Sequence, residues 1–412
     1  MNMRFAVALL LSLAPLYSAG IPREEYKTRR AELRKSLDGV MVLFGAVEPD
    51  DLRLPYLQET NFLYLSGWHQ PGAVMMLTKS EEILFLPDRN AHMELYTGPM
   101  VGPDDADAAE RTGFDRVLPV SAVETNFVRL LEHSRKVYLL PWDDRAQKLK
   151  ALAPLHGDPE SAAIPVAKLR VVKSPAEIEL LQQAADATVA AHLAAWKMIH
   201  PGVYEYQVAA TMEGTYFAQG CEGNAYEPIV GSGPNSVILH YSANRRRADS
   251  GEVLLMDVAA ECSDYAMDVT RTVPVNGKFT PRQREIYEIV LGAQRAAIAA
   301  IKPGVKMRGD KSLNRIAMDY INSHGKDLHG EPLGKYFTHG LGHSVGLDVH
   351  DPGDINTLKA GMVITMEPGI YIPEENIGVR IEDTLLVTGN GSKNLSGALP
   401  HDPDEIEKLI GK

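Results

Sequence analysis

The second half of the chain carries the same helix boundaries twice, and this repeat limits the folds that the sequence can adopt. One predicted helix begins at the capping box Ser174-Pro175-Ala-Glu177 and ends at Ile199-His-Pro-Gly-Val203. The next begins at Thr280-Pro281-Arg-Gln283 and ends at Ile301-Lys-Pro-Gly-Val305, 102 residues after the first terminator. Pro in the first turn and Pro-Gly after the last turn are the residues expected at helix ends. The repeat therefore predicts two related halves.

Each half also predicts a hairpin with two acids. Residues 251–257, Gly-Glu-Val-Leu-Leu-Met-Asp, match residues 361–367, Gly-Met-Val-Ile-Thr-Met-Glu, and both segments are typical of strands. A second acid follows in a returning strand, Asp268 within 265–275 and Glu382 within 378–387. Two such halves packed about a pseudo-twofold axis would bring all four acids to one cleft. The four are Asp257, Asp268, Glu367 and Glu382.

Four carboxylates in one cleft require positive charge between them, because they would otherwise repel one another. Together with His343 they form a set of oxygen and nitrogen donors without a thiolate, which suits Mn²⁺, Co²⁺ or Zn²⁺. Two shared divalent ions would remove the repulsion and create a site that activates water. We therefore predict a metal site with two divalent ions, for which the carboxylate-rich set favours Mn²⁺, formed by Asp257, Asp268, His343, Glu367 and Glu382.

Further histidines lie beside these ligands in the sequence. Residues 338–351 contain His339, His343 and His350 at spacings of four and seven. Gly follows His339, so the helical HExxH zinc motif is absent. One histidine of such a cluster can bind a metal while the others donate hydrogen bonds or carry protons. His240 closes the run 229–241, which fits neither a Rossmann nor a phosphate loop, and these residues alone leave its role open between structure and function.

The first 165 residues have a different organisation. Residues 1–20 join Arg4 to a short apolar stretch and small residues, which is typical of a secretory signal peptide. The stretch is shorter than the about 20 residues of a membrane span. We therefore expect an exported protein, periplasmic or extracellular, with no membrane insertion. Residues 21–165 predict a smaller α/β domain, which ends in a linker near residues 153–165. Strand signals lie at 40–44, 73–77, 83–86 and 136–140, and helix signals at 24–37 and 105–112.

Composition limits the partners and the cysteine chemistry. A chain of 412 residues is long enough for two domains, and its net charge of −12 argues against a nucleic acid partner. Cys221 and Cys262 lack the spacing of a metal or redox motif. An exported protein could join the two, but a core of this size does not need a cross-link, so plain buried thiols are the expectation and a disulfide stays the alternative.

Several segments together resemble the pita-bread metallopeptidases, and within them the Xaa-Pro aminopeptidases (aminopeptidase P). Besides Asp257, the segments are 229–241, 268–279, 339–351, 366–371 and 378–383. Residues 56–67 and 87–90 resemble the creatinase-like N-terminal domain of that family, so the resemblance spans nearly all of the chain after residue 20. It implies an α+β fold: a duplicated pita-bread domain over residues 170–412, preceded by a smaller α/β domain of the creatinase/prolidase type over 21–165.

The resemblance also implies how the metal ligands work. Asp268 and Glu382 would bridge two divalent ions, Asp257 would complete one of them, and His343 with Glu367 would complete the other. A hydroxide held between the ions would attack the carbonyl carbon of the bond before proline.

The same resemblance implies a second role for Glu367 and roles for four further residues. Glu367 would also carry a proton to the leaving nitrogen, and His350 would stabilise the oxyanion. His240, His339 and Arg380 would bind the substrate around proline, with His240 counted among the catalytic residues and His350 also in contact with the substrate.

The implied function is an exopeptidase that releases the N-terminal residue from peptides with proline second, working as a homo-oligomer (a dimer or tetramer). A prolidase, which cleaves only Xaa-Pro dipeptides, shares the metal ligands and Arg380, whereas residues 270–280 and 283–287 favour the aminopeptidase. A non-catalytic binding protein of the same fold, or a metal-free creatine hydrolase, would lack ligands, and none is missing here. Asp351-Pro352-Gly353 departs from the usual Asp-Val-Gly, and the short N-terminal domain leaves the preferred peptide length open.

Overall fold

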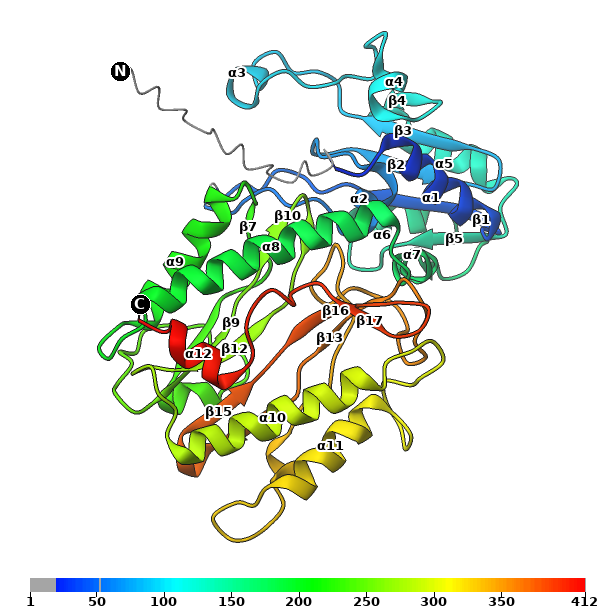
Figure 1. Cartoon of the computed structure of the whole chain (residues 1–412). Helices are drawn as coiled ribbons and strands as arrows, with labels where there is room; N and C mark the ends of the chain where they lie inside the picture. The colour runs from blue at the N-terminus through cyan, green and yellow to red at the C-terminus, as the bar shows by residue number, and fades with distance from the viewer. Residues whose placement is uncertain (1–19, 52, 412) are drawn as a thin grey trace, which may run out of the picture.

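The structure is a computed structural model that describes residues 20–51 and 53–411. Of the predicted signal peptide, residues 1–19 lie outside this part of the chain. Figure 1 shows a smaller N-terminal domain, in blue and cyan, above a larger domain that contains the C-terminus. None of the helices in the described part of the chain combines the length and the apolarity that crossing a bilayer requires.

A six-stranded sheet forms the N-terminal domain, in the order β4-β3-β2-β1-β5-β6. The predicted strands at 40–44, 73–77, 83–86 and 136–140 are confirmed as β1, β2, β3 and β5, and the predicted helices at 24–37 and 105–112 appear as α1 and a shorter α4. The strands are β1 (Gly39–Phe44), β2 (Val74–Leu77), β3 (Glu82–Leu86), β4 (Val117–Pro119), β5 (Lys136–Leu139) and β6 (Glu160–Ser161). The helices are α1 (Arg23–Lys35), α2 (Thr60–Ser66), α3 (Glu94–Thr97), α4 (Ala108–Thr112), α5 (Val123–Leu131) and α6 (Asp144–Ala151), with the 3-10 turn η1 (Val120–Ala122).

The segment predicted as a linker is structured. Its residues form β6, which pairs in parallel with β5, and the beginning of α7 (Ala163–Arg170). Pro165 lies in the first turn of α7, where its missing N–H breaks no helical hydrogen bond. Residues 153–165 therefore complete the N-terminal sheet, and α7 leads into the larger domain.

Helices flank the strands of the larger domain in both halves. Both predicted capping boxes are confirmed, with Ser174 accepting from the N–H of Glu177 and Thr280 from that of Gln283. Figure 1 shows α8 and α9 on one side of the strands and α10 and α11 on the other. The helices are α8 (Pro175–Met198), α9 (Glu205–Ala218), α10 (Pro281–Ala299), α11 (Leu313–His324) and α12 (Pro403–Leu409). The 3-10 turns are η2 (Gly233–Val237), η3 (Leu333–Tyr336) and η4 (Pro373–Glu375).

The strands of the larger domain form four small sheets. Their orders are β12-β9-β8, β11-β10-β7, β13-β16-β17 and β14-β15. The strands of the first half are β7 (Gly223–Asn224), β8 (Ile229–Ser232), β9 (Val253–Asp257), β10 (Ala260–Cys262), β11 (Tyr265–Ala266) and β12 (Thr270–Pro274). Those of the second half are β13 (Val363–Met366), β14 (Gly369–Ile372), β15 (Ile377–Arg380), β16 (Asp383–Val387) and β17 (Ser392–Asn394). The predicted α+β fold with two related halves is thus confirmed.

The two acid-bearing hairpins have corresponding registers. In the first half β9 pairs with β12, and Asp257 faces Thr270. In the second half β13 pairs with β16 up to Met366 and Asp383, and this register continued by one residue sets Glu367 opposite Glu382. Since Asp257 and Glu367 end matching strands, Thr270 and Glu382 occupy corresponding positions.

The second acids of the two hairpins do not correspond. Asp268 stands two residues before Thr270, and Arg380 stands two residues before Glu382. Asp268 therefore corresponds to Arg380, not to Glu382. Each half does supply two acids, but the symmetry expected from the sequence holds only for Asp257 and Glu367.

Both predicted returning strands are interrupted at their acids. Residues 267–269 separate β11 from β12, and residues 381–382 separate β15 from β16. In the second interruption the N–H of Glu382 donates to the carbonyl of Thr270 in the other half, at 3.1 Å. The backbone thus changes partner from its own hairpin to the opposite one, which brings the acids of the two halves together.

A buried ion pair joins the halves beside these acids. Arg271 and Asp383 occupy corresponding positions in β12 and β16, and their side chains meet at 2.7 Å with no more than 1% exposed. Arg271 also donates to the carbonyl of Glu382, and Gln294 of α10 donates to Asp383. These contacts fix the second half against the first.

Cys221 and Cys262 are joined by a disulfide, so the expectation of free thiols is wrong. Antiparallel pairing of β7 with β10 places Gly223 beside Glu261, and the two cysteines at the adjoining ends of these strands are 4.3 Å apart between Cα atoms. The sequence spacing of 41 residues gave no sign of this pairing because the contact depends on the sheet.

Candidate metal and active site

All nine predicted site residues line one cavity with a volume of about 320 Å³, at the broken ends of the two hairpins. The hairpins contribute four acids and Arg380, and the irregular loop before β13 contributes three of the histidines. The nine residues are Asp257, Asp268, Glu367, Glu382, His240, His339, His343, His350 and Arg380. The sequence had indicated this convergence through the repeat.

Three of the predicted metal ligands form the centre of the cluster. Ligand atoms of Asp268, His343 and Glu382 all lie within 4.8 Å of one another. Nε2 of His343 lies 3.3 Å from Oδ2 of Asp268 and 3.4 Å from Oε1 of Glu367. The geometry therefore brings donors from both halves within reach of a shared cation.

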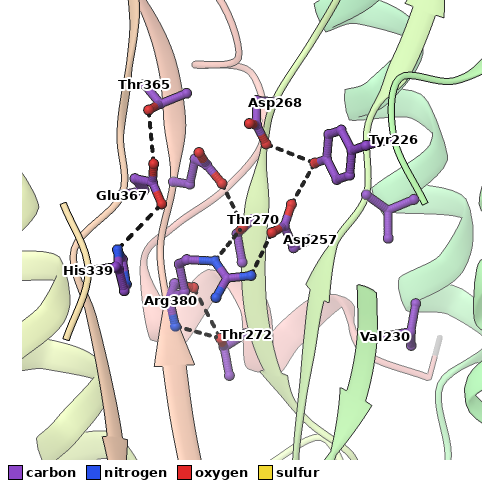
Figure 2. Close-up of polar contacts among 12 residues, drawn as sticks. Tyr226, Val230, Asp257, Asp268, Thr270, Thr272, His339, Thr365, Glu367 and Arg380 are labelled. Carbon is purple, nitrogen blue, oxygen red and sulfur yellow. Dashed lines mark hydrogen bonds and ion pairs between the residues drawn. The ribbon is translucent and has the colours of Figure 1, made fainter. Parts of the chain in front are cut away.

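Asp257 joins this cluster through a tyrosine that the sequence analysis did not single out. The hydroxyl oxygen of Tyr226 lies 2.5 Å from Oδ1 of Asp257 and 2.8 Å from Oδ1 of Asp268 (Figure 2). A phenol has one proton to donate, so it can satisfy only one of the two carboxylate oxygens at a time. The second oxygen needs a proton or a cation.

The electrostatics of the cluster indicate the same need for positive charge. Burial, followed by repulsion from neighbouring carboxylates, raises the pKa of Glu382 well above its ordinary value. Burial also raises the pKa of Asp257, and raises that of Glu367 to about 7. Burial lowers the pKa of His343, but its hydrogen bond to Asp268 and the nearby charges of Asp268 and Glu367 outweigh this and raise it to about 9. Divalent cations fit a donor set of this kind.

Arg380 is bound on three sides by protein groups. Its side chain is buried and donates to Oδ2 of Asp257 at 2.5 Å, to Thr270 at 3.1 Å and to the hydroxyl of Tyr371 at 2.8 Å. Thr270 in turn donates to Oε2 of Glu382 at 2.6 Å. Arg380 thus holds two of the acids in place, in addition to lining the cavity where a substrate role is predicted for it.

The tautomer of His339 follows from its partners. Arg380 has no acceptor atom, so the oxygen of Tyr371 accepts from Arg380 and its O–H donates to Nε2 of His339, 2.8 Å away. The proton of His339 then lies on Nδ1, which donates to the carbonyl of Gly340 at 2.8 Å. Burial and the charge of Arg380 lower the pKa of His339 to about 4, so this ring is neutral at neutral pH.

His350 and His240 lie at the open side of the cavity. The ring of His350 meets that of His343 edge to face, with centroids 4.1 Å apart. Burial, together with repulsion from His343, lowers the pKa of His350. His240 is exposed after η2, and the structure shows no hydrogen bond of its ring to any described residue. Both rings are therefore available to a bound molecule.

A buried cluster of charges anchors the loop that carries His343 and His350. Oδ1 of Asp351 accepts from Arg170 at 2.5 Å and Oδ2 accepts from Lys173 at 3.0 Å, and all three side chains are 1% exposed. Lys173 also donates to the hydroxyl of Ser344, at 3.1 Å. Arg170 comes from the end of α7, so the segment that joins the domains fixes the histidine loop.

Four residues of the site were not among the predicted site residues, although Thr270 and Tyr371 lie in segments that carry the family resemblance. Three of them, Tyr226, Thr270 and Tyr371, bind the acids or Arg380 through hydroxyl groups. The fourth, Arg308, lines the cavity from the segment between α10 and α11. Isolated hydroxyl or guanidinium residues occur throughout a protein, so only the fold identifies these.

Comparison with known proteins places the chain in a family. Residues 179–389 match metallopeptidase family M24, and residues 26–138 match the N-terminal domain of aminopeptidase P. The Xaa-Pro aminopeptidase of Haemophilus influenzae is 33% identical, with 96% of this chain and 99% of that protein covered. Human Xaa-Pro aminopeptidase 3 is also 33% identical, with 95% and 87% covered.

A solved structure gives the same result for the fold. Aminopeptidase P from Escherichia coli, solved with the inhibitor Pro-Leu, superposes with a TM-score of 0.85 at 31% identity, covering 95% of this chain and 98% of that one. This agreement confirms the predicted pita-bread domain, which follows a smaller N-terminal domain in the chain. The chain therefore belongs to metallopeptidase family M24, in the group that carries the aminopeptidase P type of N-terminal domain.

Proposed function

We infer that the protein is a metal-dependent exopeptidase that releases the N-terminal residue from peptides with proline in the second position. The observation that carries this inference is the convergence of five metal-ligand side chains, three further histidines and Arg380 in one cavity. Relatives named Xaa-Pro aminopeptidase match nearly the whole chain at 33% identity, which favours the aminopeptidase over a prolidase.

Two divalent ions fit the arrangement of the carboxylates, with Mn²⁺ favoured and Co²⁺ or Zn²⁺ as alternatives. The position of Asp268 supports two ions. Its Oδ1 and Oδ1 of Asp257 both lie at the hydroxyl of Tyr226, while its Oδ2 faces His343. The carboxylate of Asp268 thus faces Asp257 with one oxygen and His343 with the other. Such ions act as Lewis acids and make water more acidic. Metal analysis of the active protein should find two ions per chain, and full activity with one ion would refute the pair.

Glu367 transfers the proton, and His350 stabilises the negative charge that develops on the substrate. Oε1 of Glu367 accepts from Thr365 at 3.2 Å, which orients the carboxylate in the cavity. Glu367 accepts the proton of the attacking water and delivers it to the leaving nitrogen. His350 is neutral at neutral pH and donates an N–H to the oxyanion that forms on the scissile carbonyl.

Specificity for proline follows from the chemistry of the scissile bond. The bond before proline is a tertiary amide without an N–H. A peptidase that recognises its substrate through a hydrogen bond from that N–H therefore cannot form this bond. His240 and His339 line the same cavity as the acids and can contact the pyrrolidine ring instead. The neutral state of His339 suits an apolar ring better than a charged imidazolium would.

A comparison of two short substrates tests this function. The purified protein, loaded with Mn²⁺, should release glycine from Gly-Pro-Gly and leave the dipeptide Gly-Pro intact. Treatment with a chelator should abolish the cleavage, and added Mn²⁺ should restore it. Cleavage of the dipeptide alone would identify a prolidase, and full activity without metal would refute the metal-dependent reaction.

Export and assembly are further parts of the proposal. The basic and apolar leader at residues 1–20 supports export to the periplasm or the medium, and the disulfide is of the kind that persists in oxidising compartments. N-terminal sequencing should find a mature chain that begins near residues 19–21, whereas an uncleaved cytosolic protein would contradict export. Light scattering should give the mass of a dimer or tetramer, and a monomer would contradict the homo-oligomer.

A further inference from the structure

Arg308 is a cation of the catalytic cavity to which the proposed reaction gives no role. It lies between α10 and α11, is exposed, and lines the cavity together with His339 and Gly340. Its backbone N–H donates to Asn356 at 3.1 Å, which fixes this part of the loop. Its guanidinium group forms no hydrogen bond or ion pair with any residue in 20–51 or 53–411. Arg380, the other arginine of the cavity, has its donors taken by protein groups.

The position of Arg308 relates it to the part of the substrate that follows proline. Glu367 lies 3.7 Å from Nδ1 of His339, and Nη2 of Arg308 lies 3.8 Å from the place where a side chain on Gly340 would begin. A series of neighbouring residues thus leads from the acids through His339 and Gly340 to Arg308. A peptide that has its scissile bond at the acids can place later residues along this series.

The charge around Arg308 is opposite to that of the whole protein. Residues 302–315 contain five cations, Lys302, Lys306, Arg308, Lys311 and Arg315, against the single acid Asp310, in a chain with a net charge of −12. Lys302, Lys311 and Arg315 line a separate cavity, and Arg315 pairs with Asp319, so Arg308 is the one cation of this segment that lines the catalytic cavity. An exposed cation that lines a cavity attracts anions. The planar guanidinium group binds a carboxylate through two parallel hydrogen bonds, for which it has free donors here.

We propose that Arg308 binds a carboxylate that follows proline in the substrate, and so selects peptides with an anionic group near the cleaved bond. This inference rests on the proposed function. The carboxylate can be the C-terminus of a tripeptide or the side chain of an acidic third residue, and both present the same group. The preference would answer the question of peptide length that the sequence left open, because a tripeptide always carries its terminal carboxylate at this place.

The test compares three peptides that share the same cleaved bond: Gly-Pro-Gly, its amide Gly-Pro-Gly-NH₂, and Gly-Pro-Glu-NH₂. The wild-type protein should cleave one or both anionic peptides on the order of fivefold better in kcat/KM than the neutral amide, mainly through a lower KM. R308Q should bring the peptides to nearly equal kcat/KM, and R308K should keep part of the difference. A preference for Gly-Pro-Gly alone assigns the terminal carboxylate, and one for Gly-Pro-Glu-NH₂ alone assigns the side chain.

K311Q is the matched control, because it removes one positive charge from the same segment but lies on a separate cavity. It should keep the wild-type ratio between anionic and neutral peptides. Equal cleavage of all three peptides by the wild-type protein would overturn the role of Arg308 while leaving the proposed function intact. An unchanged ratio in R308Q, or an equal loss in K311Q, would overturn it as well. Failure to cleave any of the three peptides would instead refute the proposed function, and this inference with it.

Discussion

Replacement of Asp351 by alanine should destabilise the larger domain strongly. The change removes the one carboxylate that both Arg170 and Lys173 contact, and leaves two cations that are 1% exposed. Breaking a buried ion pair in this way costs about 3–5 kcal/mol. Arg170 keeps its contact with Asp348 at 2.7 Å, whereas Lys173 keeps only the hydroxyl of Ser344 among the partners shown. We therefore expect a loss of about 4 kcal/mol in the free energy of unfolding.

Urea unfolding of a double-mutant cycle measures the expected coupling. K173M removes one of the stranded cations, so D351A/K173M should be more stable than the sum of the two single losses predicts, by about 2 kcal/mol. D319A provides the surface control, because the pair of Asp319 with Arg315 is 57% and 60% exposed and should contribute less than about 1 kcal/mol. D351A should also lower kcat, since the loop it anchors carries His343 and His350.

Two results would refute this reasoning. A loss below about 1 kcal/mol in D351A would show that the buried charges do not depend on the carboxylate. Strict additivity in the cycle would show that Asp351 and Lys173 do not act as a pair. Either outcome would remove the physical basis for a rigid histidine loop.

Three further predictions concern the cysteines, a partly buried acid and a metal ligand. C262S should lose about 4 kcal/mol of unfolding free energy, because the disulfide closes a loop of 41 residues, and equal stability in oxidised and reduced wild-type protein would contradict this. Burial, with nearby carboxylates led by Asp264, raises the pKa of Glu261 to about 7. The folded state therefore binds this proton more tightly than the unfolded state, and the free energy of unfolding falls as the pH rises from about 4.5 to 7. E261Q should therefore gain about 3 kcal/mol over the wild type at pH 8 and nothing at pH 4 in urea unfolding, and a gain independent of pH would refute the shift. D268A should abolish peptide cleavage and keep the circular dichroism spectrum of the wild type, whereas near-normal turnover would exclude a ligand shared by two ions.

The sequence predicted the elements whose signals are local. Capping boxes and Pro-Gly terminators defined α8 and α10, because these signals act within one turn of helix. Apolar runs between Gly, Pro and charge defined the strands of the N-terminal sheet for the same reason. The linker was misjudged because β6 has only two residues and gains its hydrogen bonds from β5, which is distant in sequence.

Features that depend on contacts across the fold could not be predicted in this way. The repeat indicated that the acids converge, but the true correspondence of Asp268 with Arg380 became visible only from the strand registers. The disulfide depends on the pairing of β7 with β10. Tyr226 reaches the acids, and Arg308 reaches the cavity, from segments without any pattern, so their participation follows from the tertiary structure alone.

The mismatch between Asp268 and Arg380 has a consequence for how a peptide enters. A cavity with perfect twofold symmetry looks the same from both halves, so it would accept a chain running in either direction. Here the position two residues before Thr270 carries an anion, and the corresponding position two residues before Glu382 carries a cation. The cavity therefore has a built-in polarity, and the two orientations of a peptide meet different charges. An enzyme that removes residues from one end only needs this distinction between the ends of its substrate.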